Sequence, residues 1–241
     1  MRLTDYTTLT FDCYGTLIDW ETGIHNALKP WLDKHGLAMS QDEALELFAR
    51  HESAQEHETP DMLYSELLSA TLRRIGAELD LAVSDDEAAA VGNSVRDWPA
   101  FPDSARALAY LKQHYKLVIL SNVDRASFAH SNAKLGVEFD AVYTAEDIGS
   151  YKPDPRNFAY LLEHLAGLGV AKDDILHTAQ SLTHDHVPAE DAGLATCWID
   201  RRHDKQGYGA TKPPPRQPRI DARFISMGDM AEAHRAELSS G

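Results

Sequence analysis

The sequence predicts an α/β protein with a Rossmann-like, doubly wound parallel sheet as its core and a helical cap domain inserted after the first strand. Two observations lead to this fold class. From residue 104 to residue 199, short apolar segments alternate with segments of helical periodicity, which is typical of parallel strands joined by crossover helices. Residues 20–95 show helical periodicity and no convincing strand. We therefore expect the core to comprise residues 1–18 and 99–241, and the cap residues 19–98.

The first core element is a buried strand. Residues 7–13 (TTLTFDC) are rich in residues that favour strands, and Tyr14-Gly15-Thr16 follows at once as a turn. The prolines Pro99 and Pro102 later mark the return of the chain from the cap to the core.

The cap is predicted as four helices. The first presents Leu28, Trp31 and Leu32 on one face. The second starts after Ser40, which forms a capping-box pattern with Glu43. The other two are expected at residues 62–79 and 85–95.

The rest of the core is predicted as alternating elements followed by a loop and a final strand and helix. Helices are expected at residues 104–114, 125–135, 155–165, 184–192 and 229–238. Strands are expected at residues 116–120, 141–144, 175–180, 195–199 and 223–227. Residues 201–219 are rich in Pro, Gly and Lys, and we expect them to form a surface loop.

Charge and composition exclude several classes of protein. The 241 residues include 23 basic and 38 acidic side chains, a formal charge of -15, which repels nucleic acid and anionic lipid. No apolar segment approaches the roughly 20 residues that span a bilayer, and the first residues lack the apolar run of a signal peptide. Two cysteines, Cys13 and Cys197, exclude a disulfide framework. We expect a cytoplasmic protein that binds neither nucleic acid nor membrane.

Polar residues follow four of the predicted strands, at the edge where ligands bind to parallel sheets. These four segments are Asp12-Cys13-Tyr14-Gly15-Thr16, Ser121-Asn122, Lys152-Pro153-Asp154-Pro155 and Gln180-Ser181-Leu182-Thr183-His184-Asp185. Each alone is a common cap or turn sequence. Their occurrence together, in this order, indicates one site.

With these segments the chain resembles the haloacid dehalogenase superfamily, and FDCYGTLIDW is close to the first motif of its 2-haloacid dehalogenase subfamily. The resemblance covers residues 7–18 and 100–200 and the position of the cap. It implies that Asp12 is the nucleophile, that Ser121 and Asn122 form the second motif, and that Lys152 and Asp185 form the third and fourth.

The chemistry of these residues agrees with such a role. A carboxylate becomes a useful nucleophile when it is held rigid, stripped of water and aimed at the reacting carbon. Lys152 can keep Asp12 ionised, and Thr16 and Ser121 offer hydroxyls that orient the carboxylate or the substrate. Asp185 is suited to position Lys152 or the water that cleaves the ester. We expect Asp12, Lys152, Asp185 and Ser121 to be catalytic.

The resemblance also implies a substrate, a small 2-haloacid, and an arginine from the early cap helices that binds it. Arg50 is the best match by position. Tyr14 and Trp20 are candidates to line the halogen pocket, beside Thr16 and Asn122 as further substrate-binding residues. The expected products are a 2-hydroxy acid and a halide, with no cofactor and no metal.

A Mg²⁺-dependent phosphatase of the same fold is the main alternative. Phosphoryl-transferring members of the superfamily carry a second aspartate two residues after the nucleophile, and acidic metal ligands in the fourth motif. This chain has Tyr14 and Gln180 at two of those positions. A non-catalytic protein that binds small carboxylates is a third possibility.

Some features depart from the subfamily or invite other interpretations. Gln180, Leu182 and Phe158 replace residues that are common in the subfamily, so the surroundings of the hydrolytic water are altered. The spacing of His184 and His186 does not favour a metal site. The polar cluster of the second cap helix is expected to be a solvated face; it consists of His51, Glu52, Glu56, His57 and Glu58. A homodimer is expected by analogy alone.

Overall fold

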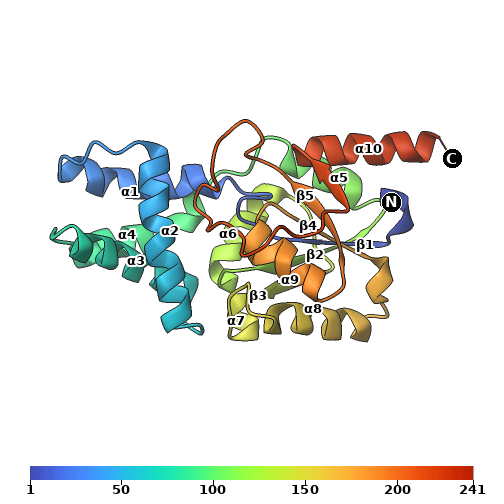
Figure 1. The fold of residues 1–241 in the computed structure, drawn as a ribbon, viewed down its shortest axis with the longest axis horizontal. Coiled ribbons are helices and arrows are strands. Elements are labelled where there is room, and N and C mark those ends of the chain that lie inside the picture. Colours follow the sequence, from blue (N-terminus) through green and yellow to red (C-terminus); the bar gives the residue numbers. More distant parts are fainter. Residues whose placement is uncertain (241) are drawn as a thin grey trace.

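The computed structural model describes residues 1–240 and contains a six-stranded sheet whose strands are all parallel (Figure 1). The spatial order is β3-β2-β1-β4-β5-β6, which confirms the predicted doubly wound topology. The strands are β1 (Thr8–Phe11), β2 (Lys116–Ser121), β3 (Ala141–Thr144), β4 (Ile175–Ala179), β5 (Ala195–Ile199) and β6 (Ala222–Phe224).

Helices cover both faces of this sheet. Along β2, Leu117 and Ile119 belong to one apolar cluster with buried side chains of α5, α6 and α10, whereas Val118 and Leu120 belong to a second cluster with α8 and α9. Successive residues of a strand face opposite sides, so a continuous apolar run is what a doubly covered strand requires. Figure 1 shows α5 and α10 on one side of the sheet and α8 on the other. The core helices are α5 (Ser104–Leu111), α6 (Arg125–Leu135), α7 (Ala145–Ile148), α8 (Arg156–Gly167), α9 (Val187–Asp191) and α10 (Met227–Ser239).

The topology places the carboxyl ends of three strands next to one another. β1 lies between β2 and β4, and the chain changes direction across the sheet at this point. Asp12 follows β1, Ser121 ends β2, and Gln180 follows β4. The polar segments predicted to converge therefore do meet at one edge of the sheet.

Four helices lie together between β1 and β2 in the sequence and at one end of the molecule in space (Figure 1). They are α1 (Trp20–Lys34), α2 (Gln41–Glu58), α3 (Tyr64–Glu78) and α4 (Asp85–Gly92). The capping box is present, because the Ser40 side chain accepts a hydrogen bond from the Glu43 N–H while the Glu43 carboxylate accepts one from the Ser40 N–H. These helices fit the expected cap of residues 19–98, whose boundaries stay a prediction.

Hydrogen bonds join the cap helices to the core at several places. The hydroxyl of Tyr151 donates to the Met62 carbonyl at 2.6 Å, and the Ser65 N–H donates to the Asp124 carboxylate at 3.1 Å. Lys134 of α6 donates to the carbonyl of Trp98, where the chain leaves the cap. These bonds hold α2 and α3 close to the carboxyl edge of the sheet.

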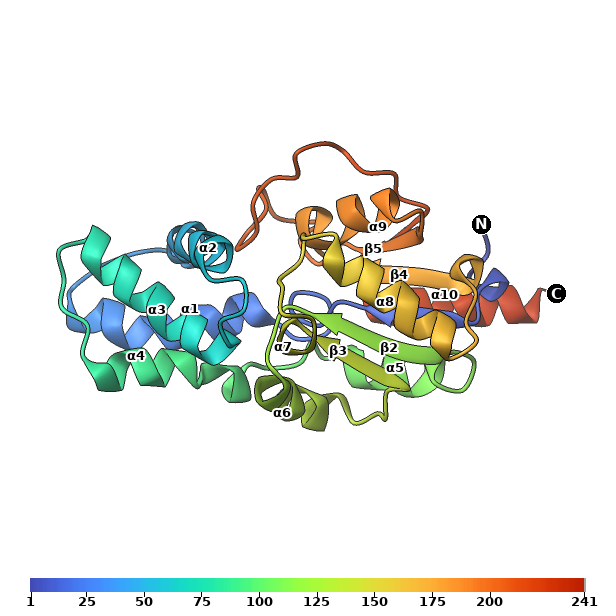
Figure 2. The same cartoon turned by 90° about the horizontal axis from the view of Figure 1, so that it is seen from below.

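The predicted loop of residues 201–219 contains no helix or strand, as expected, but it crosses from the core to the cap (Figure 2). Arg202 donates to the Glu21 carboxylate of α1 at 2.5 Å, and the same carboxylate accepts from the Ala210 N–H at 3.1 Å. Thr211 thereby reaches the region between the two parts of the molecule. Within residues 1–240, none of the helices is both long and apolar enough to cross a membrane.

Candidate active site

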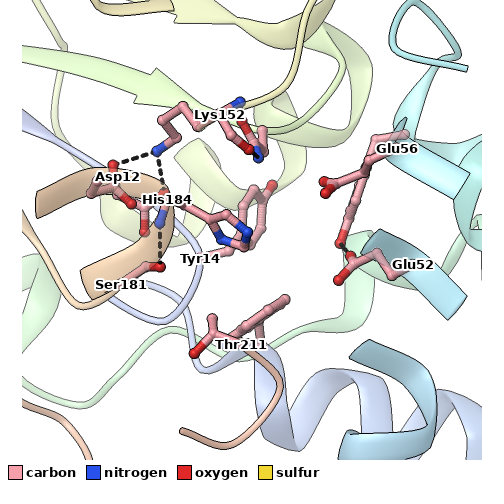
Figure 3. A pocket seen from close by; sticks show the side chains of 12 residues that line it. Asp12, Tyr14, Glu52, Glu56, Lys152, Ser181, His184 and Thr211 are labelled. Carbon is pink, nitrogen blue, oxygen red and sulfur yellow. Dashed lines mark hydrogen bonds and ion pairs between the residues drawn. The ribbon is translucent and has the colours of Figure 1, made fainter. Parts of the chain in front are cut away.

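Asp12, Lys152 and Asp185 form a buried ionic cluster at the carboxyl edge of the sheet (Figure 3). The Lys152 ammonium donates to Asp12 Oδ1 at 2.9 Å, to Asp185 Oδ1 at 2.7 Å and to the Leu120 carbonyl at 2.9 Å. An ammonium has three protons, and these three acceptors use all of them. The Lys152 side chain is only 1% exposed, so the cluster is shielded from bulk water.

The turn after β1 fixes the other oxygen of the Asp12 carboxylate. The Thr16 hydroxyl donates to Asp12 Oδ2 at 2.9 Å and accepts from the Gln180 N–H at 3.0 Å. Gly15 has a φ of +90°, a region that favours glycine, and a Cβ atom at this position would lie 2.9 Å from Trp20 Nε1. The tight turn needs this glycine, and it brings Thr16 back to the carboxylate.

Burial and the neighbouring ammonium act in opposite directions on the two aspartates. Burial raises the pKa of Asp12 to about 6, although the charge of Lys152 lowers it. Burial also opposes ionisation of Asp185, but Lys152 and a hydrogen bond from His177 outweigh it and hold the pKa of Asp185 well below its usual range. The two carboxylates in turn raise the pKa of Lys152 against the effect of burial. At neutral pH the cluster holds two carboxylates and one ammonium.

His177 of β4 is a site residue that the sequence interpretation missed. Its Nε2 lies 3.0 Å from Asp185 Oδ1, and its Nδ1 lies 2.8 Å from the Thr10 hydroxyl. Burial lowers the pKa of His177, so the ring is neutral. A histidine in the buried strand sequence Ile175–Ala179, whose other residues are uncharged, was the signal that could have revealed it.

A cavity of about 40 Å³ lies between this cluster and the cap helix α2. In Figure 3 the side chains of Glu52 and Glu56 lie across the cavity from Asp12 and Lys152. A volume of this size suits a molecule of a few heavy atoms. The lining residues are Asp12, Tyr14, Trp20, Glu52, Glu56, Tyr64, Asn122, Lys152, Ser181, His184, Asp185 and Thr211.

Besides Asp12, Lys152 and Asp185, four more of the predicted residues lie around the cavity or just behind it. Trp20 and Tyr14 line it, and the Tyr14 hydroxyl is hydrogen-bonded to Ser131 at 3.0 Å. Asn122 also lines it, and its amide makes two hydrogen bonds to the backbone of Lys152, at 2.7 and 2.9 Å. Ser121 is buried behind the cavity lining, and its hydroxyl has no partner among residues 1–240.

Arg50 does not lie at the cavity, contrary to expectation. Its side chain is 60% exposed and donates to the Glu78 carboxylate of α3 at 3.0 to 3.1 Å. The reason is helical geometry: Arg50 points to the outer face of α2, whereas Glu52 and Glu56 share the inner face with Phe48.

The interpretation of Glu52 and Glu56 as a solvated face was wrong. Glu52 is 5% exposed, and it accepts a hydrogen bond of 2.7 Å from the Tyr64 hydroxyl. Burial raises the pKa of Glu52 to about 7 and raises that of Glu56 well above its usual range. The signal was present in the sequence, because Glu52 lies four residues after Phe48, in the apolar stripe of the helix.

The residues around Asp12 do not fit a divalent cation. Across residues 1–240, no cluster of three or more His, Cys, Asp or Glu side chains is arranged to hold a metal. The Lys152 ammonium bonds to Oδ1 of both Asp12 and Asp185, so one oxygen of each carboxylate is already engaged by a cation. His184 lines the cavity, whereas His186 bonds to the Ala179 carbonyl, so these two histidines do not converge.

The chain is similar to known proteins both in sequence and in fold. The chain is 29% identical over 210 residues to (S)-2-haloacid dehalogenase 4A of Burkholderia cepacia, covering 82% of this chain and 84% of the relative. It is 26% identical to pyrimidine 5'-nucleotidase YjjG of Escherichia coli, over 45% of this chain and 48% of the relative. The structure of L-2-haloacid dehalogenase from Xanthobacter autotrophicus shares the fold, with a TM-score of 0.76, 19% identity, and 95% and 98% of the two chains covered.

Residues 6–178 match the model of the haloacid dehalogenase-like hydrolases. Since this match includes β1 with Asp12, the cap and the Lys152 segment, the chain belongs to the haloacid dehalogenase-like hydrolase family.

Proposed function

We propose that this chain is a hydrolytic dehalogenase that cleaves the carbon–halogen bond of a small 2-haloacid through an ester at Asp12. The observation that carries the proposal is the buried Asp12–Lys152–Asp185 cluster facing a small cavity that has tyrosine, not aspartate, at position 14. The 29% identical relative is named as a dehalogenase of (S)-2-haloacids, which supports this substrate class.

The first step is an attack by a carboxylate oxygen of Asp12 on the carbon that carries the halogen. A carbon–oxygen bond forms, the carbon–halogen bond breaks, and the halide leaves with the electron pair. Lys152 and Thr16 hold the carboxylate in place, and burial removes the water that would otherwise surround it. A halide needs no proton to leave. This suits Tyr14, whose hydroxyl is engaged with Ser131.

The second step is hydrolysis of the ester at the Asp12 carboxyl carbon. Water adds to this carbon, and the bond between the carboxyl carbon and the substrate oxygen breaks, which restores the Asp12 carboxylate. One proton of the water ends on the hydroxyl of the 2-hydroxy acid, and the other is released to solvent. Asp185 is ionised and lines the cavity, so we assign it the positioning of this water.

The phosphatase alternative has less support from the site. Its proton donor would be a carboxylic acid two residues after Asp12, where this chain has Tyr14, and its metal ligands would need an acid at Gln180. Mg²⁺ prefers several oxygen ligands, and Lys152 already engages one oxygen of each of the two aspartates that remain. The nucleotidase relative matches less than half of the chain.

The test is halide release from 2-chloropropionate and from haloacetates, with Mg²⁺ and with chelator, for the wild type and Asp12→Asn. We expect halide release that chelator does not change and that Asp12→Asn abolishes. Phosphate release from phosphomonoesters that requires Mg²⁺ would favour the phosphatase. Binding of small carboxylates without any turnover would favour the non-catalytic alternative. A homodimer and a cytoplasmic location stay predictions.

A further inference from the structure

The cavity contains no free cation for the carboxylate of a 2-haloacid. Its acidic lining residues are Asp12, Glu52, Glu56 and Asp185, and its one lysine is Lys152. The three protons of that lysine are already donated to Asp12, Asp185 and the Leu120 carbonyl. Arg50, the expected partner of the substrate, points away from the cavity. An anionic substrate would thus meet carboxyl groups on both sides.

Three hydroxyl groups around the cavity are already engaged. The Tyr14 hydroxyl pairs with Ser131, the Tyr64 hydroxyl donates to Glu52, and the Thr211 hydroxyl donates to the Tyr208 carbonyl. A buried carboxylate without a donor or cation is strongly unfavourable. The Ser181 hydroxyl and the neutral His184 ring can still donate from the core side of the cavity, whereas Glu52 and Glu56, on the cap side, can donate to the substrate only when they carry a proton.

We propose that Glu52 and Glu56 are the specificity-determining residues of this site and that they bind the substrate carboxylate in their protonated form, through carboxyl–carboxylate hydrogen bonds. The two residues are one helical turn apart on α2, and both side chains point into the cavity opposite Asp12 (Figure 3). The inference rests on the proposed function, since it names how that site takes its substrate.

The geometry of Glu52 supports this role. The Tyr64 hydroxyl occupies Glu52 Oε1, so Oε2 is the oxygen that can carry a proton into the cavity. Two carboxyl groups on adjacent turns disfavour each other's charge, and burial acts in the same direction. An incoming carboxylate adds a further negative charge, which strengthens the tendency of the pair to hold a proton.

The charged and titratable groups that face this pair come from several elements. The core contributes Asp12, Lys152, His184 and Asp185, and α3 contributes Tyr64. Burial lowers the pKa of His184 to about 4, so this ring is neutral at the pH of interest. Lys212 lines an outer hollow with Glu56, and its charge lowers the pKa of Glu56, but burial outweighs this effect. Among these groups, Asp12 is the one other residue that can take up a proton near neutral pH.

Proton uptake on binding gives the most direct test, and it does not require turnover. The probe is lactate, a 2-hydroxy acid, titrated into the intact protein by calorimetry at pH 7.5 in two buffers of different ionisation enthalpy. We expect uptake of about one proton per lactate and a Kd that rises about tenfold per pH unit above pH 7. In the double variant Glu52→Gln/Glu56→Gln, the side-chain amides donate hydrogen bonds at any pH. Proton uptake should therefore vanish, and the Kd for lactate should no longer change with pH. Glu46→Gln, at an exposed position of α2, is the matched control.

Three outcomes would overturn the proposal. The first is a lactate affinity that does not change between pH 6.5 and 8.5. The second is proton uptake that persists in the double variant, which would assign the proton to Asp12. The third is tighter binding of the neutral analogue lactamide than of lactate throughout this range, which would indicate that the glutamates accept hydrogen bonds from the ligand. Loss of halide release with proton uptake intact would instead count against the proposed function alone.

Discussion

The imidazole of His177 lies behind the carboxylate of Asp185 as a hydrogen-bond donor, with Nε2 3.0 Å from Oδ1. Asp185 is ionised and can only accept, so Nε2 must carry the ring proton, and Nδ1 then accepts from the Thr10 hydroxyl at 2.8 Å. This chain of bonds fixes the ring and the carboxylate together. It connects a residue buried inside β4 to the step in which the ester is hydrolysed.

Replacement of His177 by leucine should slow hydrolysis of the ester more than its formation. A hydrogen bond to a charged group contributes about 1.5–3 kcal/mol, so we expect kcat to fall about 10- to 100-fold. Halide should then appear in a burst, and intact-mass spectrometry should show protein esterified at Asp12. His177→Gln, which keeps a donor, should recover part of the activity. A leucine variant whose turnover equals that of the wild type would show that His177 has only a packing role.

Replacement of Lys152 by methionine should abolish activity, because Asp12 would lose the charge that favours its ionised form. It should also reduce stability most at high pH. Without the ammonium, the pKa values of Asp12 and Asp185 in the folded protein rise above their unfolded values, so the folded state binds more protons and stability falls as pH rises. The loss is on the order of 3–5 kcal/mol when both carboxylates are charged. Denaturant unfolding of the wild type and the variant at pH 5 and pH 8 measures this loss in the free energy of unfolding. A larger loss at pH 5 than at pH 8 would contradict the explanation.

The turnover of the wild type should rise with pH through the pKa of its nucleophile. Burial raises the pKa of Asp12 to about 6, and only the ionised carboxylate attacks carbon. We expect kcat to increase about tenfold per unit on the acid side of pH 6 and to level off above it. The measurement is halide release at saturating substrate from pH 4.5 to 8. A profile that is flat down to pH 4.5 would mean that the charge of Lys152 outweighs burial and keeps the pKa of Asp12 below that range.

Substitution of Thr16 by valine should reduce kcat about tenfold while the fold persists. The valine cannot donate to Asp12 Oδ2, and it leaves the Gln180 N–H without its acceptor. Thr16→Ser keeps the hydroxyl and serves as the control. Single-turnover halide release compares the two variants, and equal rates for Val and Ser would remove Thr16 from the positioning of the nucleophile.

Arg50→Ala should leave KM for 2-chloropropionate within about twofold of the wild type. The guanidinium is exposed and pairs with Glu78, and such surface pairs contribute at most about 1 kcal/mol to stability. Steady-state kinetics and a thermal melt test this. A tenfold rise in KM would place Arg50 at the substrate after all and would indicate that the cap changes its arrangement on binding.

Much of the fold was predictable because its signals are local. The helix at Arg125–Leu135 and the strand at Ala141–Thr144 have the predicted limits, since α6 is capped by the Asp124 side chain and ends at Gly136 in the left-handed region. The convergence of Asp12 and Lys152 was also accessible, because parallel strands bring their carboxyl ends to one edge of the sheet.

The rest of the site depends on side-chain direction and on a long connection. Charge alone did not distinguish Arg50, on the outer face of α2, from Glu52 on its inner face. Thr211 lies in a segment without periodicity, so its return to the cavity could not be inferred. His177 stands out as a histidine in a buried strand, but both faces of that strand are covered, so the sequence pattern does not show that its side chain reaches Asp185.

The three bonds of the Lys152 ammonium also have a mechanical consequence. They join the end of β1, the end of β2 and the turn after β4 through a single atom. Local opening at one of these strand ends therefore exposes the other two, so backbone amides near Asp12, Ser121 and Asp185 should exchange with deuterium as one cooperative unit. A substitution that changes the reactivity of this edge of the sheet is therefore expected to change its rigidity as well.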